Sequence, residues 1–170
     1  MLKIIIACVL FELSLFSSQI NIDNIVKKAY NSNKGVILYL HRVGCSYCNS
    51  MEEFTLDDDE VVSYIEKNYV FIEVNISHKD TITYHGKKSG GICLAKNIGY
   101  DFYPSTLFLD KNANIEYASV GYKDESEFLT ILQYVHKKMY NKMSLSEYKK
   151  SIGFKKDTQA EIVDPRKHAR

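Results

Sequence analysis

The chain has 170 residues, 45% of them hydrophobic and 25% charged, which is enough to bury the core of one domain without disulfide staples. The formal net charge of +1 gives no argument for a nucleic-acid partner. From residue 137 onward ten Lys or Arg residues stand against four Asp or Glu, and we interpret this basic part as a solvated surface. We expect a monomer.

Residues 1–18 have the pattern of a secretory signal: a basic start, an apolar run and small residues at Ser17 and Ser18. Glu12 interrupts the apolar run, which is also short for a membrane span. We predict that this segment directs export and is cleaved. A retained N-terminal anchor and a buried helix are the alternatives.

The first half of the chain alternates helical and strand patterns. Apolar residues at helical spacing predict a helix over 21–30, and the apolar run 36–40 predicts a strand buried on both faces. A second helix is expected to begin at Cys45 and to kink and restart at 56–60, where acidic residues gather. Alternation over 70–76 predicts the next strand.

The second half begins with the polar segment 77–91, which predicts an insertion with a short hairpin around 81–87. A short helix is expected at 92–98, closed by glycine. Two strands follow, and a long amphipathic helix covers 124–139. The two strands form an antiparallel hairpin and span 106–110 and 115–120.

This order of elements predicts an α/β sandwich in which helices flank a central mixed sheet of four strands. We place the domain at 19–143 and a C-terminal extension at 144–170. The extension is expected to begin with a short helix over 144–152. From 154 onward few apolar residues remain, which predicts disorder.

The sequence Cys45-Ser46-Tyr47-Cys48 stands where the second helix begins. Cysteines at this spacing can form a small disulfide, and a helix N-terminus favours the thiolate of the first, with a pKa of roughly 3.5–7.5 in such motifs. A thiolate attacks a disulfide, and the second cysteine then resolves the mixed disulfide. Half of a zinc site has the same spacing, so the motif alone leaves both chemistries open.

Cys93 is the remaining cysteine if Cys8 leaves with a cleaved signal. An odd count argues against a purely structural disulfide framework. We interpret Cys93 as a buried structural thiol, with a third redox thiol and a metal ligand beside Cys45 and Cys48 as alternatives. Three histidines could assist such a metal site: His41, His78 and His85.

Taken together, these segments resemble the thioredoxin superfamily over about residues 22–139. The resemblance rests on 36–40 leading into Cys45-Ser46-Tyr47-Cys48, on Met51, on 70–76 and on 103–110. Cys-x-Tyr-Cys followed by methionine and acidic residues is similar to secreted members, such as the periplasmic thioredoxins of bacterial sulfur-oxidation and disulfide-handling systems.

The resemblance implies an exported, periplasmic thiol–disulfide oxidoreductase that acts on protein thiols and disulfides. Cys45 would be the nucleophile and Cys48 the resolving cysteine. Pro104 would form a cis peptide bond, present backbone to an extended substrate and keep metals off the cysteines. Tyr47 and Tyr103 would line the substrate groove beside Ser46. No cofactor would be needed, because electrons pass by thiol exchange, for example from a membrane thiol transporter.

Two positions depart from thioredoxin itself. Gly44 stands where thioredoxin has a tryptophan, and Tyr39 stands where it has a buried aspartate that helps to move the proton of the second cysteine. Water or another group must therefore serve as the proton relay. Two other functions also fit the motif: a binding, chaperone or metal-handling module with a regulatory cysteine pair, and a disulfide oxidase or isomerase.

His41 lies four residues before Cys45 and has two interpretations. A charged His41 would stabilise the Cys45 thiolate and make the protein more oxidising. The alternative is a surface histidine at the end of the strand. We interpret Glu52 and Glu53, which follow the cysteines, as solvated helix charges.

Overall fold

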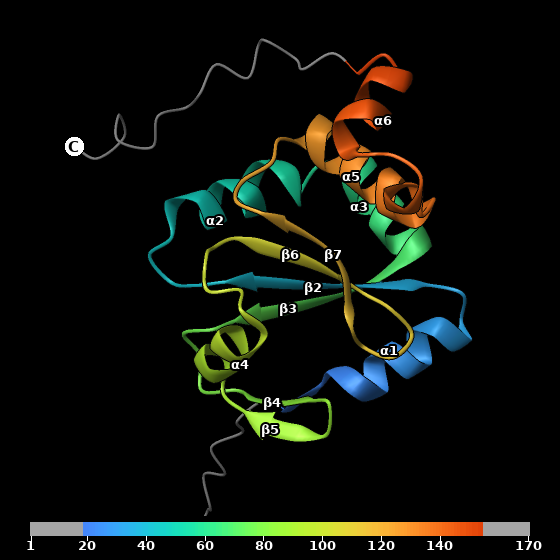
Figure 1. Cartoon of the computed structure of the whole chain (residues 1–170). Helices are drawn as coiled ribbons and strands as arrows, with labels where there is room; N and C mark the ends of the chain where they lie inside the picture. Colours follow the sequence, from blue (N-terminus) through green and yellow to red (C-terminus); the bar gives the residue numbers. More distant parts are fainter. Residues whose placement is uncertain (1–18, 155–170) are drawn as a thin grey trace, which may run out of the picture.

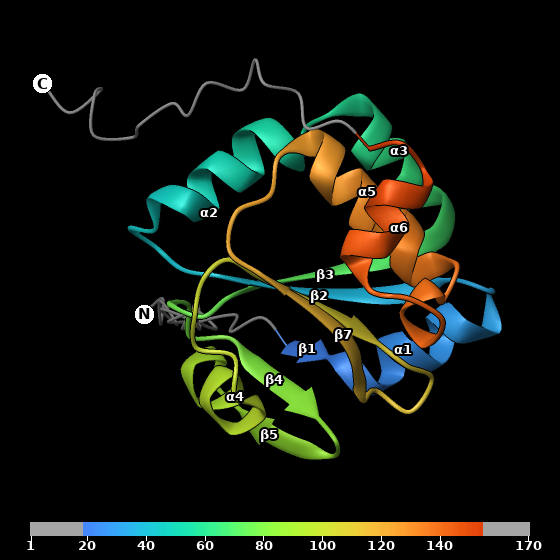
Figure 2. The same cartoon turned by 45° about the horizontal axis from the view of Figure 1, so that its top comes forward.

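The computed structural model of the protein describes residues 19–154. The predicted signal at 1–18 and the predicted disorder beyond 154 lie outside the described residues. Helices cover both faces of one central sheet, and a smaller sheet packs beside the helices of one of these layers (Figures 1 and 2). None of the helices between residues 19 and 154 is long and apolar enough to cross a membrane.

The central sheet contains β3 (Tyr69–Asn75), β2 (Gly35–His41), β6 (Ser105–Leu109) and β7 (Ile115–Val120), in that order. Strand β2 runs parallel to β3 and antiparallel to β6, and β6 and β7 are antiparallel. The predicted four-stranded mixed sheet is confirmed. Because β2 is a central strand, its backbone is paired on both sides and its position is well fixed.

Strand β2 divides the interior into two cores, because successive side chains point to opposite faces. Val36, Leu38 and Leu40 belong to one core, and Ile37 and Tyr39 belong to the other. His41 continues the second series and ends the strand. Both faces of β2 are therefore covered, as its apolar run predicts.

Two helical layers cover these cores. The first is formed by α1 (Ile22–Asn31) and α4 (Gly91–Ile98). The second is formed by α2 (Ser46–Ser50), α3 (Asp59–Asn68), α5 (Glu125–His136) and α6 (Leu145–Ser151). Helix α4 ends at Gly99, whose left-handed φ of 79° is the conformation that glycine adopts easily.

The predicted insertion forms a second sheet with strand order β1-β4-β5. Strands β4 (Thr81–Tyr84) and β5 (Lys87–Ser89) are the hairpin expected near 81–87. Strand β1 (Gln19–Asn21) pairs in parallel with β4 and was not predicted. Its three residues carry no strand pattern of their own, so the pairing partner decides their conformation.

Asp23 fastens this insertion to α1. Its carboxylate accepts hydrogen bonds from the backbone N–H groups of His85 and Gly86, each at 2.8 Å. These two residues form the hairpin turn and have φ values of 48° and 70°. A two-residue turn with both φ values positive matches the twist of a hairpin.

The C-terminal helices differ from the prediction. The helix expected to reach Met139 ends at His136, because Lys138 takes a left-handed φ of 49°. A 3₁₀ turn over Met139–Asn141 follows, and then α6 begins at the Ser144–Glu147 capping box. Helix α6 lies where a short helix is predicted, and Tyr148 on it is buried in the core that α5 also lines.

Candidate active site

A disulfide joins Cys45 and Cys48 where the chain leaves β2 and enters α2. The S–S distance is 2.08 Å and the Cα atoms are 5.2 Å apart, within the usual range for a disulfide. Cys45 is the N-cap residue of α2, and its Sγ accepts a hydrogen bond from the Cys48 N–H at 3.2 Å. The same contact would stabilise a thiolate on Cys45 in the reduced protein.

The two cysteines differ in exposure. Cys48 is 0% exposed, whereas Cys45 is only partly buried. Gly44 lies in the turn between β2 and the helix, and its φ of 74° favours glycine. An incoming sulfur atom can therefore reach Cys45 but not Cys48.

Cys45 lies in an open surface pocket between the β2–α2 turn and the loop before β6. The pocket is lined by Arg42, Gly44, Cys45, Ser46, Tyr47, Asp101, Phe102 and Tyr103. Three residues predicted for the site, Ser46, Tyr47 and Tyr103, thus gather beside Cys45. The prediction missed Arg42, Asp101 and Phe102.

Two of the aromatic side chains that line this pocket are largely exposed to solvent. Phe102 is 73% exposed and Tyr47 is 61% exposed. Burial and the Asp101 carboxylate raise the pKa of Tyr103, and the Arg42 charge opposes them, so the phenol stays neutral. Phe102 precedes Pro104 by two residues, which is the signal that could have placed it at the site.

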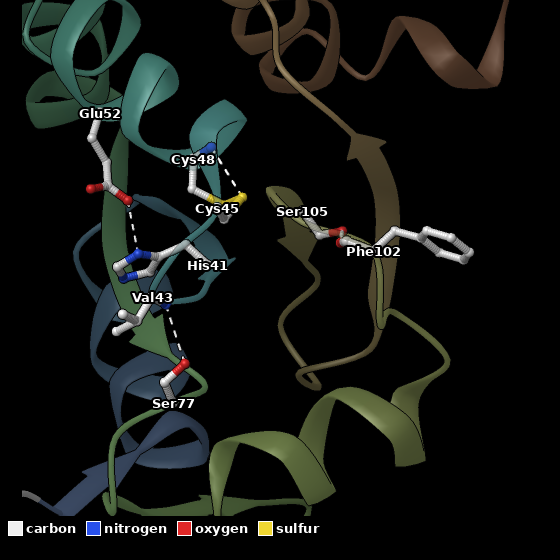
Figure 3. The surroundings of a disulfide bond; sticks show 8 residues. All are labelled: His41, Val43, Cys45, Cys48, Glu52, Ser77, Phe102 and Ser105. Carbon is white, nitrogen blue, oxygen red and sulfur yellow. Dashed lines mark hydrogen bonds and ion pairs between the residues drawn. A yellow bond between two sulfur atoms is a disulfide. The ribbon is translucent and has the colours of Figure 1, made fainter. Parts of the chain in front are cut away.

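Buried residues and hydrogen bonds fix the loop before β6. The Tyr103–Pro104 peptide bond is cis, and Pro104 is buried. The Ser105 hydroxyl, also buried, donates to the Phe102 carbonyl at 2.6 Å, and the Pro104 carbonyl accepts from the Gly121 N–H at 2.8 Å. Figure 3 shows Ser105 and Phe102 on the opposite side of the disulfide from His41.

His41 is buried, with 7% of its surface exposed, so its interpretation as a surface residue is wrong. Its ring stacks on Tyr39 at 5.4 Å between centroids. Nδ1 lies 2.8 Å from Glu52 Oε1, and Nε2 lies 2.9 Å from Glu73 Oε1 (Figure 3 draws the first pair). The stabilisation of the Cys45 thiolate by His41 stays a prediction.

The helix widens directly after the cysteines. Residues Met51–Thr55 form a π-helical turn, in which the Leu56 N–H donates to the Met51 carbonyl at 2.8 Å. The kink predicted at 56–60 follows this turn, and α3 restarts behind the N-cap Asp58. Such wide turns are frequent at functional sites.

Glu52 and Glu53, on this wide turn, differ from each other. Glu53 is exposed, as expected for a solvated helix charge. Glu52 has its Oε1 atom buried against His41. The interpretation of Glu52 as a solvated charge is therefore wrong for that oxygen atom.

Cys93 is exposed on α4, so its interpretation as a buried thiol is wrong. Its Sγ accepts a hydrogen bond from Asn97 Nδ2 at 3.4 Å. Helix α4 buries Leu94 and Ala95 instead. Within residues 19–154 no three His, Cys, Asp or Glu side chains come together as a metal site.

The fold and the site define a protein with a thioredoxin-type α/β architecture and a C-x-x-C disulfide in which Cys45 lines a surface pocket and Cys48 is buried. A family model described as a thioredoxin-like domain matches residues 22–136. The chain belongs to this family. The family and the cysteine pair are consistent with thiol–disulfide oxidoreductase activity.

Comparison with solved structures shows the same fold. A thioredoxin-fold protein from Helicobacter pylori is 23% identical, with a TM-score of 0.57, over 71% of this chain and 84% of that one. A thioredoxin from Thermus thermophilus is 24% identical, with a TM-score of 0.54, over 69% and 85%. A DsbH oxidoreductase is 13% identical, with a TM-score of 0.51, over 66% and 78%. The comparison with curated proteins gave no match.

Proposed function

We propose that the protein is an exported thiol–disulfide oxidoreductase that reduces or exchanges disulfides of protein substrates. The observation that carries the proposal is the unequal exposure of the two cysteines: Cys45 lines an open pocket and Cys48 is 0% exposed. Exchange chemistry needs this arrangement, because one sulfur must meet the substrate and the other must meet only its partner.

The reaction proceeds in two exchanges. The Cys45 thiolate attacks a substrate disulfide and forms a mixed disulfide, and one substrate thiolate leaves. Cys48 then attacks Cys45, re-forming the Cys45–Cys48 disulfide and releasing the second substrate thiol. The substrate gains two electrons and the protein loses them. A partner thiol, such as that of a membrane thiol transporter, returns the protein to the dithiol without a cofactor.

Two further features support protein substrates and export. The pocket is open and carries exposed aromatic side chains at Tyr47 and Phe102, which suit a peptide better than a small polar disulfide. The signal-like pattern of residues 1–18 supports delivery to the periplasm, as in the thioredoxins of sulfur-oxidation and disulfide-handling systems. The mass of the mature protein recovered from a periplasmic fraction tests export.

Insulin reduction with dithiothreitol as electron donor tests the activity. The wild type is expected to reduce insulin, and Cys45→Ser is expected to abolish the reaction. Cys48→Ser is expected to trap substrates as mixed disulfides on Cys45. An inactive wild-type protein that nevertheless binds unfolded chains or metal would contradict the proposal and favour a binding module.

The reduction potential of the pair then gives the direction of electron flow. Equilibration in glutathione or dithiothreitol buffers should give a value near that of thioredoxin, about −270 mV, if the protein is a reductant. A value near about −120 mV would make it an oxidant that donates its disulfide.

A further inference from the structure

The pocket beside Cys45 contains two charged side chains that the exchange reaction does not use. Arg42 directly follows β2, and Asp101 lies in the loop between α4 and β6. Both residues are exposed. Because the pocket lies between the β2–α2 turn and the loop before β6, these opposite charges belong to its two walls. A substrate cysteine that reaches Cys45 must enter between these walls.

Neither charge is neutralised by a partner in the protein. None of the ion pairs within residues 19–154 includes Arg42 or Asp101, so the two side chains do not pair with each other. Both nevertheless act on the same ring of the pocket, since burial and then Asp101 raise the pKa of the Tyr103 phenol and Arg42 lowers it. The two charges thus remain available to a charged partner in the pocket.

The backbone beside each charge is tied to a neighbouring segment. On one wall the N–H of Val43, the residue after Arg42, donates to the Ser77 hydroxyl at 3.2 Å. On the other wall the Phe102 carbonyl accepts from the buried Ser105 hydroxyl at 2.6 Å. Figure 3 shows Val43 and Phe102 on opposite sides of the disulfide. The two walls are therefore in place before a substrate arrives, which lowers the entropic cost of binding.

We propose that Arg42 and Asp101 select protein substrates by charge, and that the preferred segment has an acidic residue on one side of its reactive cysteine and a basic residue on the other. The acidic residue pairs with Arg42, and the basic residue pairs with Asp101. This inference rests on the proposed function, since it names the substrate class of the same site.

The charges of the two walls cancel, which argues against a preference for net charge. A segment with two acidic residues is attracted by Arg42 and repelled by Asp101, and a segment with two basic residues meets the reverse. Only a segment with one charge of each sign, in the right order, is attracted at both walls. Complementary charges of this kind raise the rate of encounter and suppress wrong partners.

The expected preference is modest, because both walls are exposed to solvent. An exposed ion pair changes a rate or equilibrium constant by about 1.5- to 5-fold, so two matched contacts give about 2- to 25-fold. Salt should weaken the preference, because the Debye length falls from about 10 Å at 0.1 M to about 3 Å at 1 M. A preference that depends on shape alone would not respond to salt in this way.

Short peptides with blocked ends test the proposal, each with one cysteine held in a disulfide with 4-thiopyridine. The Cys45 thiolate attacks the peptide sulfur, and the 4-thiopyridine thiolate leaves and reports the rate by its absorbance. The peptide cysteine is flanked by glutamate and lysine in either order, by two glutamates, by two lysines or by two glutamines. The reaction of each peptide with dithiothreitol corrects for its intrinsic reactivity. The protein carries Cys8→Ser and Cys93→Ser, so that only the site cysteines react.

One order of the mixed peptide is expected to react about 2- to 25-fold faster than the glutamine peptide. Exchanging the wall charges, by Arg42→Glu with Asp101→Lys, should transfer this preference to the other order. The matched control exchanges two exposed charges at the end of α3, by Glu66→Lys with Lys67→Glu, and should keep the order that the parent prefers. Each preference is a ratio of rates within one variant, so a general change of activity cancels.

Equal rates for the two mixed peptides in the parent, or an unchanged order of preference in the Arg42–Asp101 exchange, would overturn the proposal. A preference that persists undiminished at 1 M salt would also overturn it. If the parent releases no 4-thiopyridine from any peptide, the proposed exchange function fails, which is a separate result. If the exchange variant does not fold, Arg42→Gln and Asp101→Asn take its place. Each should then lose part of the preference, and no loss in either would refute the proposal.

Discussion

Replacing Phe102 by alanine is expected to weaken the reduction of protein disulfides and to leave the reduction of a small disulfide unchanged. Phe102 is 73% exposed at the rim of the pocket that contains Cys45. A protein substrate that reaches Cys45 must pass this ring, so part of the exposed apolar surface is covered in the complex. A small disulfide reaches the same sulfur atom without covering the ring.

The size of the effect follows from the exposed area. An aromatic side chain buries about 150–250 Å², so roughly 150 Å² of Phe102 is free to be covered. At about 25 cal/mol/Å², full coverage would contribute about 4 kcal/mol, and half coverage about 2 kcal/mol. A loss of about 2 kcal/mol corresponds to a roughly 25-fold decrease in kcat/KM.

The assay compares kcat/KM for insulin with the rate for oxidised dithiothreitol or glutathione disulfide. Phe54→Ala is the matched control, because Phe54 is 45% exposed on the π-turn and lies outside the pocket lining. Equal activity of Phe102→Ala and wild type on insulin would refute the reasoning. An equal loss on protein and small disulfides would also refute it, because it would indicate damage to the cysteine pair.

Three other variants test the fold and its ionisable groups. Gly91→Ala should lower the free energy of unfolding by about 1–3 kcal/mol, because the added Cβ would lie 2.7 Å from Ile76 Cα. Urea denaturation measures the change. Gly90→Ala is the control and should shift the urea midpoint little, because the described residues leave space around Gly90. Burial raises the pKa of Asp110, but hydrogen bonds from the β6–β7 turn lower it overall. Asp110→Asn should therefore cost most stability above about pH 4 and less as the pH falls through the lowered pKa, and a cost independent of pH would contradict this. Cys93→Ser should keep full insulin reduction, and a large loss would assign Cys93 a redox role.

Local signals made much of the fold predictable. The apolar run of β2 and the alternation of β3 depend on neighbours in the chain, and so do the helix ends. Asp58 and Asp124 accept hydrogen bonds from the first turns of α3 and α5, and Gly99 closes α4. Such residues act within one turn, so the sequence contains their whole effect.

The errors in the fold have non-local causes. Strand β1 forms because Ile20 pairs with Ile82, far along the chain. Met139 continued the apolar spacing of α5 and does pack against the same core, but from the 3₁₀ turn that follows Lys138. The apolar periodicity thus predicted correctly which core Met139 contacts. It placed Met139 in α5, whereas the residue lies in the 3₁₀ turn.

In the site, too, the features set by local sequence were predicted, and the features set by distant residues were not. The cysteine motif was visible because spacing alone defines it. The burial of His41 and of Glu52 Oε1 depends on β3 and the π-turn, which bring carboxylates to the end of β2. Cys93 lies in the sequence Ile92-Cys93-Leu94-Ala95, where apolar character is continuous and no period shows which side faces the core.

The π-turn after the cysteines also constrains the length of this segment. Thr55, at its end, is fully buried and donates its hydroxyl to the Lys123 carbonyl at 2.6 Å, which ties the segment to the chain entering α5. Deleting one residue from Met51–Thr55 would rotate the following residues by about 100° relative to Cys48. Homologous chains that keep both this tie and the cysteine pair should therefore tolerate substitutions at exposed positions such as Phe54 more readily than insertions or deletions.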